Sequence, residues 1–264
     1  MSEVSRTLPK ILITNDDGIE SVLLSEMIAR LAGKFRIIVA APANERSFCG
    51  RSFTFGQDVE VKEVQGWPCQ AFAVDGTPSD CVNIALGHLC GDELPDLVLS
   101  GPNIGRNTSI GFISGSGTVA GALEGAFWGI RALAVSQGFE NNAVANEMKR
   151  YESLPESFQP IFDRGLDVVE IAIERCMSRE PTRLCVDSLN LPYHYADGEN
   201  EILDVPPVDY DFGCFFTKTE DGRYTSGAGK RTRITAPETL TDIDCVSQGK
   251  AAWTRLDFSR IYTS

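Results

Sequence analysis

The stretch Ile11-Leu12-Ile13-Thr14-Asn15-Asp16-Asp17-Gly18 decides the fold that this chain is expected to adopt. Its first four residues form an apolar run typical of a buried strand, and two adjacent carboxylates follow at once. Burying two like charges side by side is costly unless a positive charge compensates them. A divalent metal ion is the simplest compensation, because carboxylate oxygens suit Mg²⁺ and Mn²⁺. The alternative is that one Asp caps the following helix and the other lies in a turn before Gly18.

Short apolar runs alternate with helical patterns from this stretch as far as residue 137. Residues 53–64 suggest an extended or hairpin segment, and the chain from 140 to 177 looks helical. Strands are expected at residues 11–14, 36–40, 69–74, 97–99, 132–135 and 184–186, and helices at 23–31, 78–89 and 118–128. Apolar strands in alternation with helices predict an α/β fold, with a Rossmann-like, mostly parallel sheet flanked by helices.

Polar side chains follow three of the expected strands. Asp16 and Asp17 come after the first strand, Ser47 after the second, and Asn103 after the strand at 97–99. In parallel α/β sheets, ligands gather at the carboxyl ends of the strands. These four side chains are therefore expected to lie near one another.

A glycine-rich segment, Ser114-Gly115-Ser116-Gly117-Thr118, leads into the expected helix at 118–128. Backbone N–H groups at such a helix start attract anions, and the hydroxyl groups add hydrogen-bond donors. The segment lacks the Gly-Lys-Ser/Thr ending of a Walker A loop. A phosphate site is one interpretation, and a flexible loop with close helix packing is the other.

Three further segments carry weaker signals. Ser100–Asn107 combines glycines with Asn side chains and suits either a ligand site or a tight polar turn. Within Asn44–Ser47, Arg46 is a candidate phosphate contact and Ser47 a candidate metal ligand, although a solvated loop explains the segment equally well. Gly76–Cys81 is explained by a helix cap.

Composition limits the classes of function. The chain has 264 residues, 42% of them hydrophobic, and a formal net charge of −13 from 37 acidic and 24 basic residues. This surplus of acid argues against binding nucleic acid, whose phosphates require Lys and Arg. The N-terminal residues MSEVSRTLPK contain no apolar signal core, and no run is long enough to span a bilayer. We expect a cytoplasmic protein with no membrane partner.

Cysteine and histidine usage points away from several chemistries. The eight cysteines include no C-x-x-C pair, which disfavours a zinc or thioredoxin-type site and favours free thiols. His88 and His194 are the only histidines. A histidine-based metal cluster and a Ser-His-Asp triad are therefore poorly supported.

Five motifs, in this order, resemble the SurE survival-protein family of metal-dependent nucleotidases and acid phosphatases. They are L-I-T-N-D-D-G (12–18), A-P-A-N-E-R-S (41–47), V-D-G-T-P-S-D-C-V (74–82), L-V-L-S-G-P-N-I-G-R-N (97–107) and S-G-T-V-A-G-A-L-E-G (116–125). The likeness covers residues 10–137 and resumes at Asn190-Leu191-Pro192. Five motifs in the family order make a chance match improbable.

The resemblance implies a Rossmann-like core that hydrolyses 5′- and 3′-nucleotides with one divalent cation per subunit. It assigns Asp16, Asp17, Ser47 and Asn103 to the metal, with Asp16 and Asp17 also catalytic. A second set is assigned to the phosphate: Asn15, Asn107, Ser116, Gly117 and Thr118. The family's C-terminal hairpin and tail exchange between subunits. Residues 9–193 are thus expected to form the catalytic core, and 194–264 the segment that builds a homodimer or homotetramer.

The chain also departs from the family pattern. The segment Ile19–Leu23 replaces a Gly-containing one, Gly115 stands where a Tyr commonly precedes S-G-T, and Pro102 lies beside Asn103. Arg51 replaces a His or Asn. None of these changes removes an expected metal ligand, but each affects loop geometry and substrate preference.

Two other functions are compatible with these motifs. One is a transferase that uses a nucleotide or sugar phosphate and binds it at the same glycine-rich helix start. The other is a non-catalytic nucleotide-binding relative, against which the intact set of Asp16, Asp17, Ser47 and Asn103 argues. Release of phosphate from monoesters alone indicates the nucleotidase, and release only with an acceptor present indicates the transferase.

Overall fold

The computed structural model describes residues 8–196, 200–227 and 231–260. Its centre is a nine-stranded sheet in the order β3-β4-β2-β1-β5-β6-β7-β13-β8. The six strands from β4 to β7 run parallel, as the sequence predicts, whereas β3 and β13 are antiparallel to β4 and β7. The nine strands are β1 (Lys10–Thr14), β2 (Arg36–Pro42), β3 (Val61–Val64), β4 (Gln70–Val74), β5 (Leu97–Ile104), β6 (Arg131–Gln137), β7 (Cys185–Leu191), β8 (Ile202–Asp204) and β13 (Ala251–Asp257).

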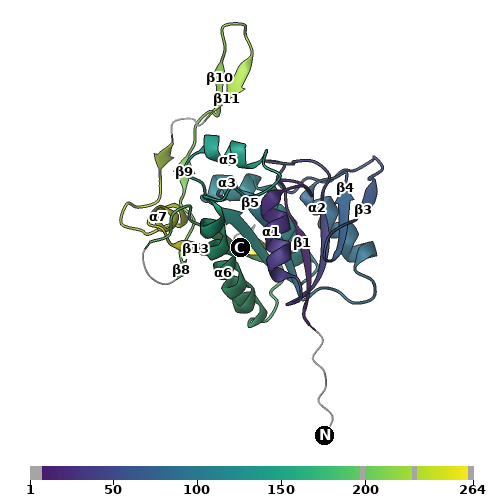
Figure 1. Cartoon of the computed structure of the whole chain (residues 1–264). Coiled ribbons are helices and arrows are strands. Elements are labelled where there is room, and N and C mark those ends of the chain that lie inside the picture. Colours follow the sequence, from purple (N-terminus) through teal and green to yellow (C-terminus); the bar gives the residue numbers. More distant parts are fainter. Residues whose placement is uncertain (1–7, 197–199, 228–230, 261–264) are drawn as a thin grey trace.

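Helices cover both faces of this sheet (Figure 1). Within the described residues, none of them is long and apolar enough to cross a membrane. The helices are α1 (Val22–Leu31), α2 (Pro78–Ile84), its π-helical continuation η1 (Ala85–Leu89), α3 (Ile110–Gly115), α4 (Gly117–Phe127), α5 (Asn142–Met148), α6 (Gln159–Met177), α7 (Asp242–Ser247) and the 3₁₀ turn η2 (Phe258–Arg260).

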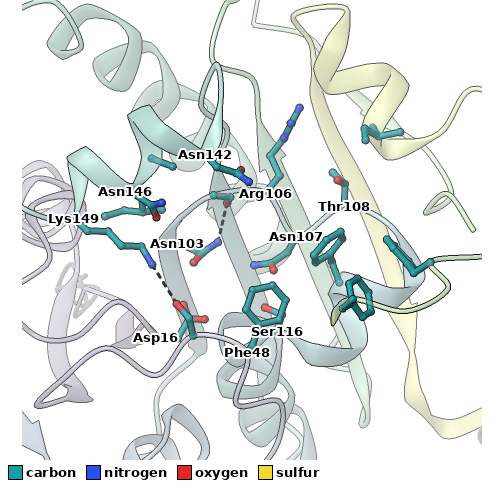
Figure 2. A pocket seen from close by; sticks show the side chains of 18 of the residues that line it. Asp16, Phe48, Asn103, Arg106, Asn107, Thr108, Ser116, Asn142, Asn146 and Lys149 are labelled. Atoms are coloured by element: carbon teal, nitrogen blue, oxygen red, sulfur yellow. Dashed lines mark hydrogen bonds between the residues drawn. The ribbon is translucent and has the colours of Figure 1, made fainter. Parts of the chain in front are cut away.

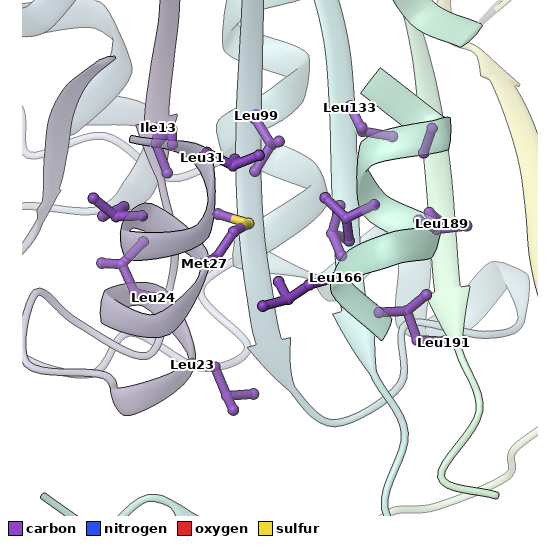
Figure 3. Close-up of a cluster of buried hydrophobic side chains, with 14 of the residues drawn as sticks. Ile13, Leu23, Leu24, Met27, Leu31, Leu99, Leu133, Leu166, Leu189 and Leu191 are labelled. Carbon is purple, nitrogen blue, oxygen red and sulfur yellow. The ribbon is translucent and has the colours of Figure 1, made fainter. Parts of the chain in front are cut away.

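The core follows from the two-residue alternation of buried strands. Ile11 and Ile13 point to the face that α1 and α6 cover, while Leu12 between them points to the face covered by α2. Figure 3 shows the first of these clusters, where Leu99 and Leu166 lie between α1 and α6. Both faces are apolar, and in β1 and β2 the polar residues lie at the strand ends.

Two expected elements differ from the structure. The strand expected at 97–99 continues as β5 to Ile104, with a register shift against β6 between Ser100 and Asn103. Gly101 allows this, because a Cβ there would lie 2.2 Å from the carbonyl oxygen of Val135. Asn103 therefore lies within a strand rather than after it.

The expected helical region 140–177 is divided into α5 and α6 by a non-helical segment at 149–158. Pro155 lies in that segment, and α6 begins with Pro160 in its first turn, where the missing N–H costs nothing. The C-terminal segment contains a hairpin, as the resemblance implies. It is formed by β10 (Phe216–Lys218) and β11 (Tyr224–Ser226).

The C-terminal segment contributes to two parts of the molecule. Its strands β8 and β13 extend the central sheet, and β9 (Tyr210–Asp211) pairs with β12 (Thr232–Arg233) outside it. The hairpin β10-β11 projects away from the body (Figure 1). Residues 197–199, 228–230 and 261–264 of this segment, and residues 1–7 of the N-terminal expectation, lie outside the described residues. The division of the chain at residue 193 stays a prediction.

Candidate functional site

A cavity of about 340 Å³ opens at the carboxyl ends of β1, β2 and β5, where the sequence predicts a site. Side chains from the ends of these strands and from the starts of α4 and α5 point into it (Figure 2). The predicted residues that line it are Asp16, Ser47, Asn103, Asn107 and Ser116. Four loops that are distant in the sequence thus meet at one edge of the sheet.

The two aspartates have unequal hydrogen bonding. The Thr118 hydroxyl donates to Asp16 Oδ1 at 2.7 Å, and the Ile104 N–H donates to Asp17 Oδ2 at 2.7 Å. The other oxygen of Asp17, Oδ1, is buried and accepts no hydrogen bond within the described residues. Asp17 lines a second, adjoining cavity of about 190 Å³.

Burial changes the acidity of both carboxyls. It raises the pKa of Asp16, against the hydrogen bond from Thr118. Burial, and then the charge of Asp16, raises the pKa of Asp17 to about 7. Both shifts have the direction expected when burial outweighs the hydrogen bonds and the nearby charge of Lys149.

Ser47 lies in the loop that follows β2, within reach of an amine. Its hydroxyl donates to Glu45 Oε1 at 2.6 Å and accepts from Lys149 Nζ at 3.2 Å. Lys149 also contacts Glu45, and its Nζ lies 3.6 Å from the unpartnered Oδ1 of Asp17. The ammonium group of Lys149 thus stands beside the predicted metal ligands as a counter-ion.

Asn103 presents an oxygen to the same region. Its amide nitrogen donates to the Gly105 carbonyl at 2.8 Å, which fixes the orientation of the side chain. Its amide oxygen accepts no hydrogen bond in the part of the chain that the structure describes. An oriented neutral oxygen of this kind is a suitable ligand for Mg²⁺ or Mn²⁺.

The donor set fits a divalent cation. Nowhere in the described residues do three or more His, Cys, Asp or Glu side chains form a metal-binding group. An ion here would therefore need hydroxyl and amide oxygens beside the two carboxylates, as Ser47 and Asn103 supply. The unpartnered Asp17 oxygen is the strongest indication, since a buried carboxylate oxygen without a donor is costly.

The predicted phosphate residues divide into two groups. Ser116 is the N-cap of α4, where its Oγ accepts from the Val119 N–H at 3.1 Å, and it lines the cavity. Asn107 also lines it, and its amide nitrogen donates to Thr118 Oγ1 at 3.2 Å and Ser136 Oγ at 2.9 Å. Gly117 and Thr118 are buried behind them and contact Asp16 instead.

Asn15 lies outside this group. It is fully buried, donates to the Gly18 carbonyl at 2.8 Å and accepts from the Gly18 N–H at 3.2 Å. Its side chain therefore shapes the turn that presents Asp16 and Asp17. A contact between Asn15 and phosphate stays a prediction.

Two arginines considered in the sequence are engaged elsewhere. Arg46 pairs with Asp75 at 3.0 Å, and Arg51 pairs with the buried Glu124 at 2.6 Å. The Gly76–Cys81 segment is a helix cap, as predicted, because Thr77 and Asp80 form a capping box at the start of α2.

Several residues that line the cavity carry no signal in the sequence. Lys149 comes from the end of α5, a helix with a polar pattern and no motif. Arg106 and Arg231 add two positive charges, and burial together with Arg231 lowers the pKa of Arg106. Four phenylalanines complete the lining: Phe48, Phe112, Phe212 and Phe215. No pattern in the sequence joins these residues, since they come from five separate segments.

Known proteins resemble this chain in both sequence and fold. The model of the family "Survival protein SurE" matches residues 11–206. A 5′-nucleotidase SurE from Rhodopirellula baltica is 32% identical over 256 residues, which cover 95% of this chain and 93% of that protein. One from Nitratiruptor is 42% identical over 144 residues, 54% of each chain. The SurE crystal structure from Aquifex aeolicus superposes with a TM-score of 0.72 at 25% identity and covers 94% of this chain and 93% of that one.

Proposed function

Because this chain belongs to the SurE survival-protein family, we propose that it is a divalent-metal-dependent phosphomonoesterase that acts as a 5′-nucleotidase. It hydrolyses nucleoside monophosphates to nucleoside and phosphate, and 3′-nucleotides are further substrates. The relatives named 5′-nucleotidase favour this activity over a transferase and over a non-catalytic binding protein. The observation that carries the proposal is the buried Asp17 oxygen that accepts no hydrogen bond within the described residues. It belongs to the residue next to Asp16, which lines the cavity that also contains the start of α4.

The proposed roles divide between the two sides of the cavity. Asp16, Asp17, Ser47 and Asn103 would hold one Mg²⁺ or Mn²⁺ ion per subunit. A bound divalent ion supplies Lewis-acid polarisation of a phosphoryl oxygen and of the attacking water. The carboxylates of Asp16 and Asp17 orient that water and accept its proton.

The phosphate lies against α4 in this proposal. The first backbone N–H groups of α4 and the Ser116 hydroxyl stabilise the charge on the phosphoryl oxygens. Asn107 lines the cavity beside them, and its amide, which donates to Thr118 and Ser136, would have to exchange one of these hydrogen bonds to bind phosphate. Thr118 acts through Asp16, because its hydroxyl donates to that carboxylate. Arg106 and Arg231 raise the local potential for an anionic substrate in a protein of net charge −13.

Phosphate release from a panel of mononucleotides tests the function. The wild type and Asp16→Asn are compared with Mg²⁺, with Mn²⁺ and with a chelator. We expect metal-dependent release from the wild type and its loss in Asp16→Asn. If no nucleotide gives metal-dependent phosphate release, the proposed enzymatic activity is wrong. If Asp16→Asn keeps full activity, only the assignment of the site residues is wrong.

A homodimer or homotetramer is part of the proposal. The projecting hairpin β10-β11 supports it, since Phe216 is 57% and Tyr224 64% exposed, a cost that a second copy would remove. Light scattering on the intact protein and on a Phe216→Ser, Tyr224→Ser variant tests this. A cytoplasmic location is also proposed, and the eight free cysteines support it.

A further inference from the structure

The cavity has two chemically unlike parts. The proposed metal and phosphate residues form one, and four phenylalanines form the other, which we call the aromatic wall: Phe48, Phe112, Phe212 and Phe215. Ring centroids are 5.9 Å apart for Phe48 and Phe112, 5.3 Å for Phe112 and Phe212, and 5.4 Å for Phe212 and Phe215. These are the spacings of aromatic rings in contact, so the wall is continuous.

Phe48 is the most exposed member of the wall, and its backbone has an energetically unfavourable conformation. Its ring is 73% exposed, and its backbone has φ = 56°, which is unusual for a bulky residue. Residues in such conformations cluster at functional sites. Gly115 lies beside the ring, and a Cβ there would be in ordinary van der Waals contact with Phe48 Cδ1, at 3.7 Å.

The wall is joined to the proposed metal site by the chain itself. Phe48 directly follows Ser47, and Phe112 lies on α3, which ends just before Ser116. Phe212 and Phe215 belong to the C-terminal segment. Phe212 lies against α3, where an added Cβ at Gly111 would meet its ring, and Phe215 packs on Phe212. A ligand whose phosphate lies at Ser116 thus has aromatic rings close by, because Phe48 and Phe112 belong to the same segments of the chain as Ser47 and Ser116.

We propose that the aromatic wall stacks the nucleobase of the substrate, with Phe48 as the face that the base covers. This inference rests on the proposed nucleotidase function and names what selects its substrate. The cavity has a volume typical of small-molecule sites, which combine apolar walls with a few polar groups. Every base has an aromatic face, so stacking favours phosphomonoesters that carry a base over sugar phosphates, with little discrimination between bases.

The test compares two substrates that differ only in the base. We measure kcat/KM for adenosine 5′-monophosphate and for ribose 5-phosphate in the wild type and in Phe48→Ala. Stacking on one aromatic side chain is worth enough that the ratio of the two values should fall roughly tenfold in Phe48→Ala. Phe48→Trp should restore the ratio. An equal loss on both substrates, or no change in either, would overturn the inference.

A matched control and a binding measurement separate this inference from the proposed function. Phe55 is 85% exposed and lies outside the cavity, so Phe55→Ala should leave the ratio unchanged. Calorimetry with adenosine requires no turnover. Weaker adenosine binding by Phe48→Ala than by the wild type supports the wall even if neither protein releases phosphate. A change in oligomeric state with unchanged adenosine binding would instead assign the wall to a second copy of the chain.

Discussion

Asp17 and Asp242 are both buried carboxylates, but only one of them has all its oxygens occupied. Asp242 Oδ2 accepts from the Ser109 N–H at 2.7 Å, and its Oδ1 accepts from Val208 and Ile243 at 2.9 and 2.8 Å. Asp17 has one donor and one unpartnered oxygen. Burial raises the pKa of both side chains. The two side chains share burial and differ in hydrogen bonding, and on this difference we propose Asp17, and not Asp242, as a functional acid.

The largest effect is expected when Asp17 is replaced by Asn. The change removes one charge of the adjacent pair and keeps the acceptor for the Ile104 N–H. Replacing a residue that only hydrogen-bonds to a metal ligand lowers metal affinity or activity by about 10–100-fold. Asp17 is itself a proposed ligand, so the loss in kcat/KM should exceed about 100-fold. In chelator, the melting temperature should stay the same or rise, because the repulsion by Asp16 is relieved. A lower melting temperature with full activity would make Asp17 a structural residue like Asp242.

Asp242→Asn is the matched control, and the expected result is reversed. One of its three backbone donors then faces an amide N–H₂ group, and an unsatisfied buried group costs about 1–3 kcal/mol. Urea unfolding should show this loss, while metal affinity, measured by calorimetry with Mn²⁺, should stay close to that of the wild type. A large loss of metal affinity would remove the distinction between the two carboxylates.

The next effect concerns how closely α4 approaches the acidic pair. A Cβ at Gly117 would lie 2.8 Å from Asp16 Cβ and 2.9 Å from its Oδ2, so Gly117→Ala displaces that carboxylate. We expect kcat/KM to fall tenfold to roughly a hundredfold, as when an orienting partner of a ligand is lost. Gly115→Ala is the control, since its nearest contact is 3.7 Å. Equal activities of the two variants would contradict this placement of Asp16.

The structure agrees best with the sequence-based expectations for features that depend on residues close together in the chain. The strand β1, the pair Asp16-Asp17 and the start of α4 each follow from a local pattern, and parallel strand order then brings them together. The extension of β5 to Asn103 was not predictable, because it depends on Gly101 fitting against Val135 of another strand. Long-range packing decides such a feature.

The residues that the sequence did not reveal are those supplied from a distance. Lys149 lies more than a hundred residues from Ser47, and Phe212 about a hundred residues from Phe112. Neither has a motif, since a single Lys or Phe is ordinary in a loop. Only the packing of α5 and of the C-terminal segment on the sheet edge turns them into parts of the cavity.

A smaller effect is expected from the amine that stands beside Asp17. The Lys149 ammonium lies 3.6 Å from the unpartnered oxygen, where it offsets charge that a metal ion would otherwise offset. Metal must then displace this amine, so Lys149→Met should bind Mn²⁺ roughly tenfold more tightly, an effect of about 1.4 kcal/mol. Calorimetry with Mn²⁺ alone measures this.

Lys34→Met is the control for the lost charge. Lys34 is 47% exposed and pairs with Glu170, and its removal changes net charge equally without touching the cavity. It should leave the Mn²⁺ affinity nearly unchanged. Weaker binding by Lys149→Met would show that Lys149 orients Ser47 and Glu45 for the metal rather than competing with it.

The smallest effect is expected at Asp244, which lies two residues after Asp242 and differs from it in acidity. Hydrogen bonds from Arg233, which bind both oxygens at 2.8 Å, hold the pKa of Asp244 well below its usual range, the opposite of Asp242. A lowered folded pKa adds stability above the unfolded value of about 3.9 and loses it as the pH falls below that value. Asp244→Asn should therefore be less stable than the wild type in urea at pH 7, and the gap should stay constant down to about pH 5 and narrow only as the pH falls below about 4. Arg233→Met should show the same convergence. A stability difference between wild type and Asp244→Asn that does not change with pH would mean that packing and hydrogen-bond geometry, not charge, make Asp244 stabilising. Asp244 and Asp242 would then differ only in the arrangement of their hydrogen-bond partners.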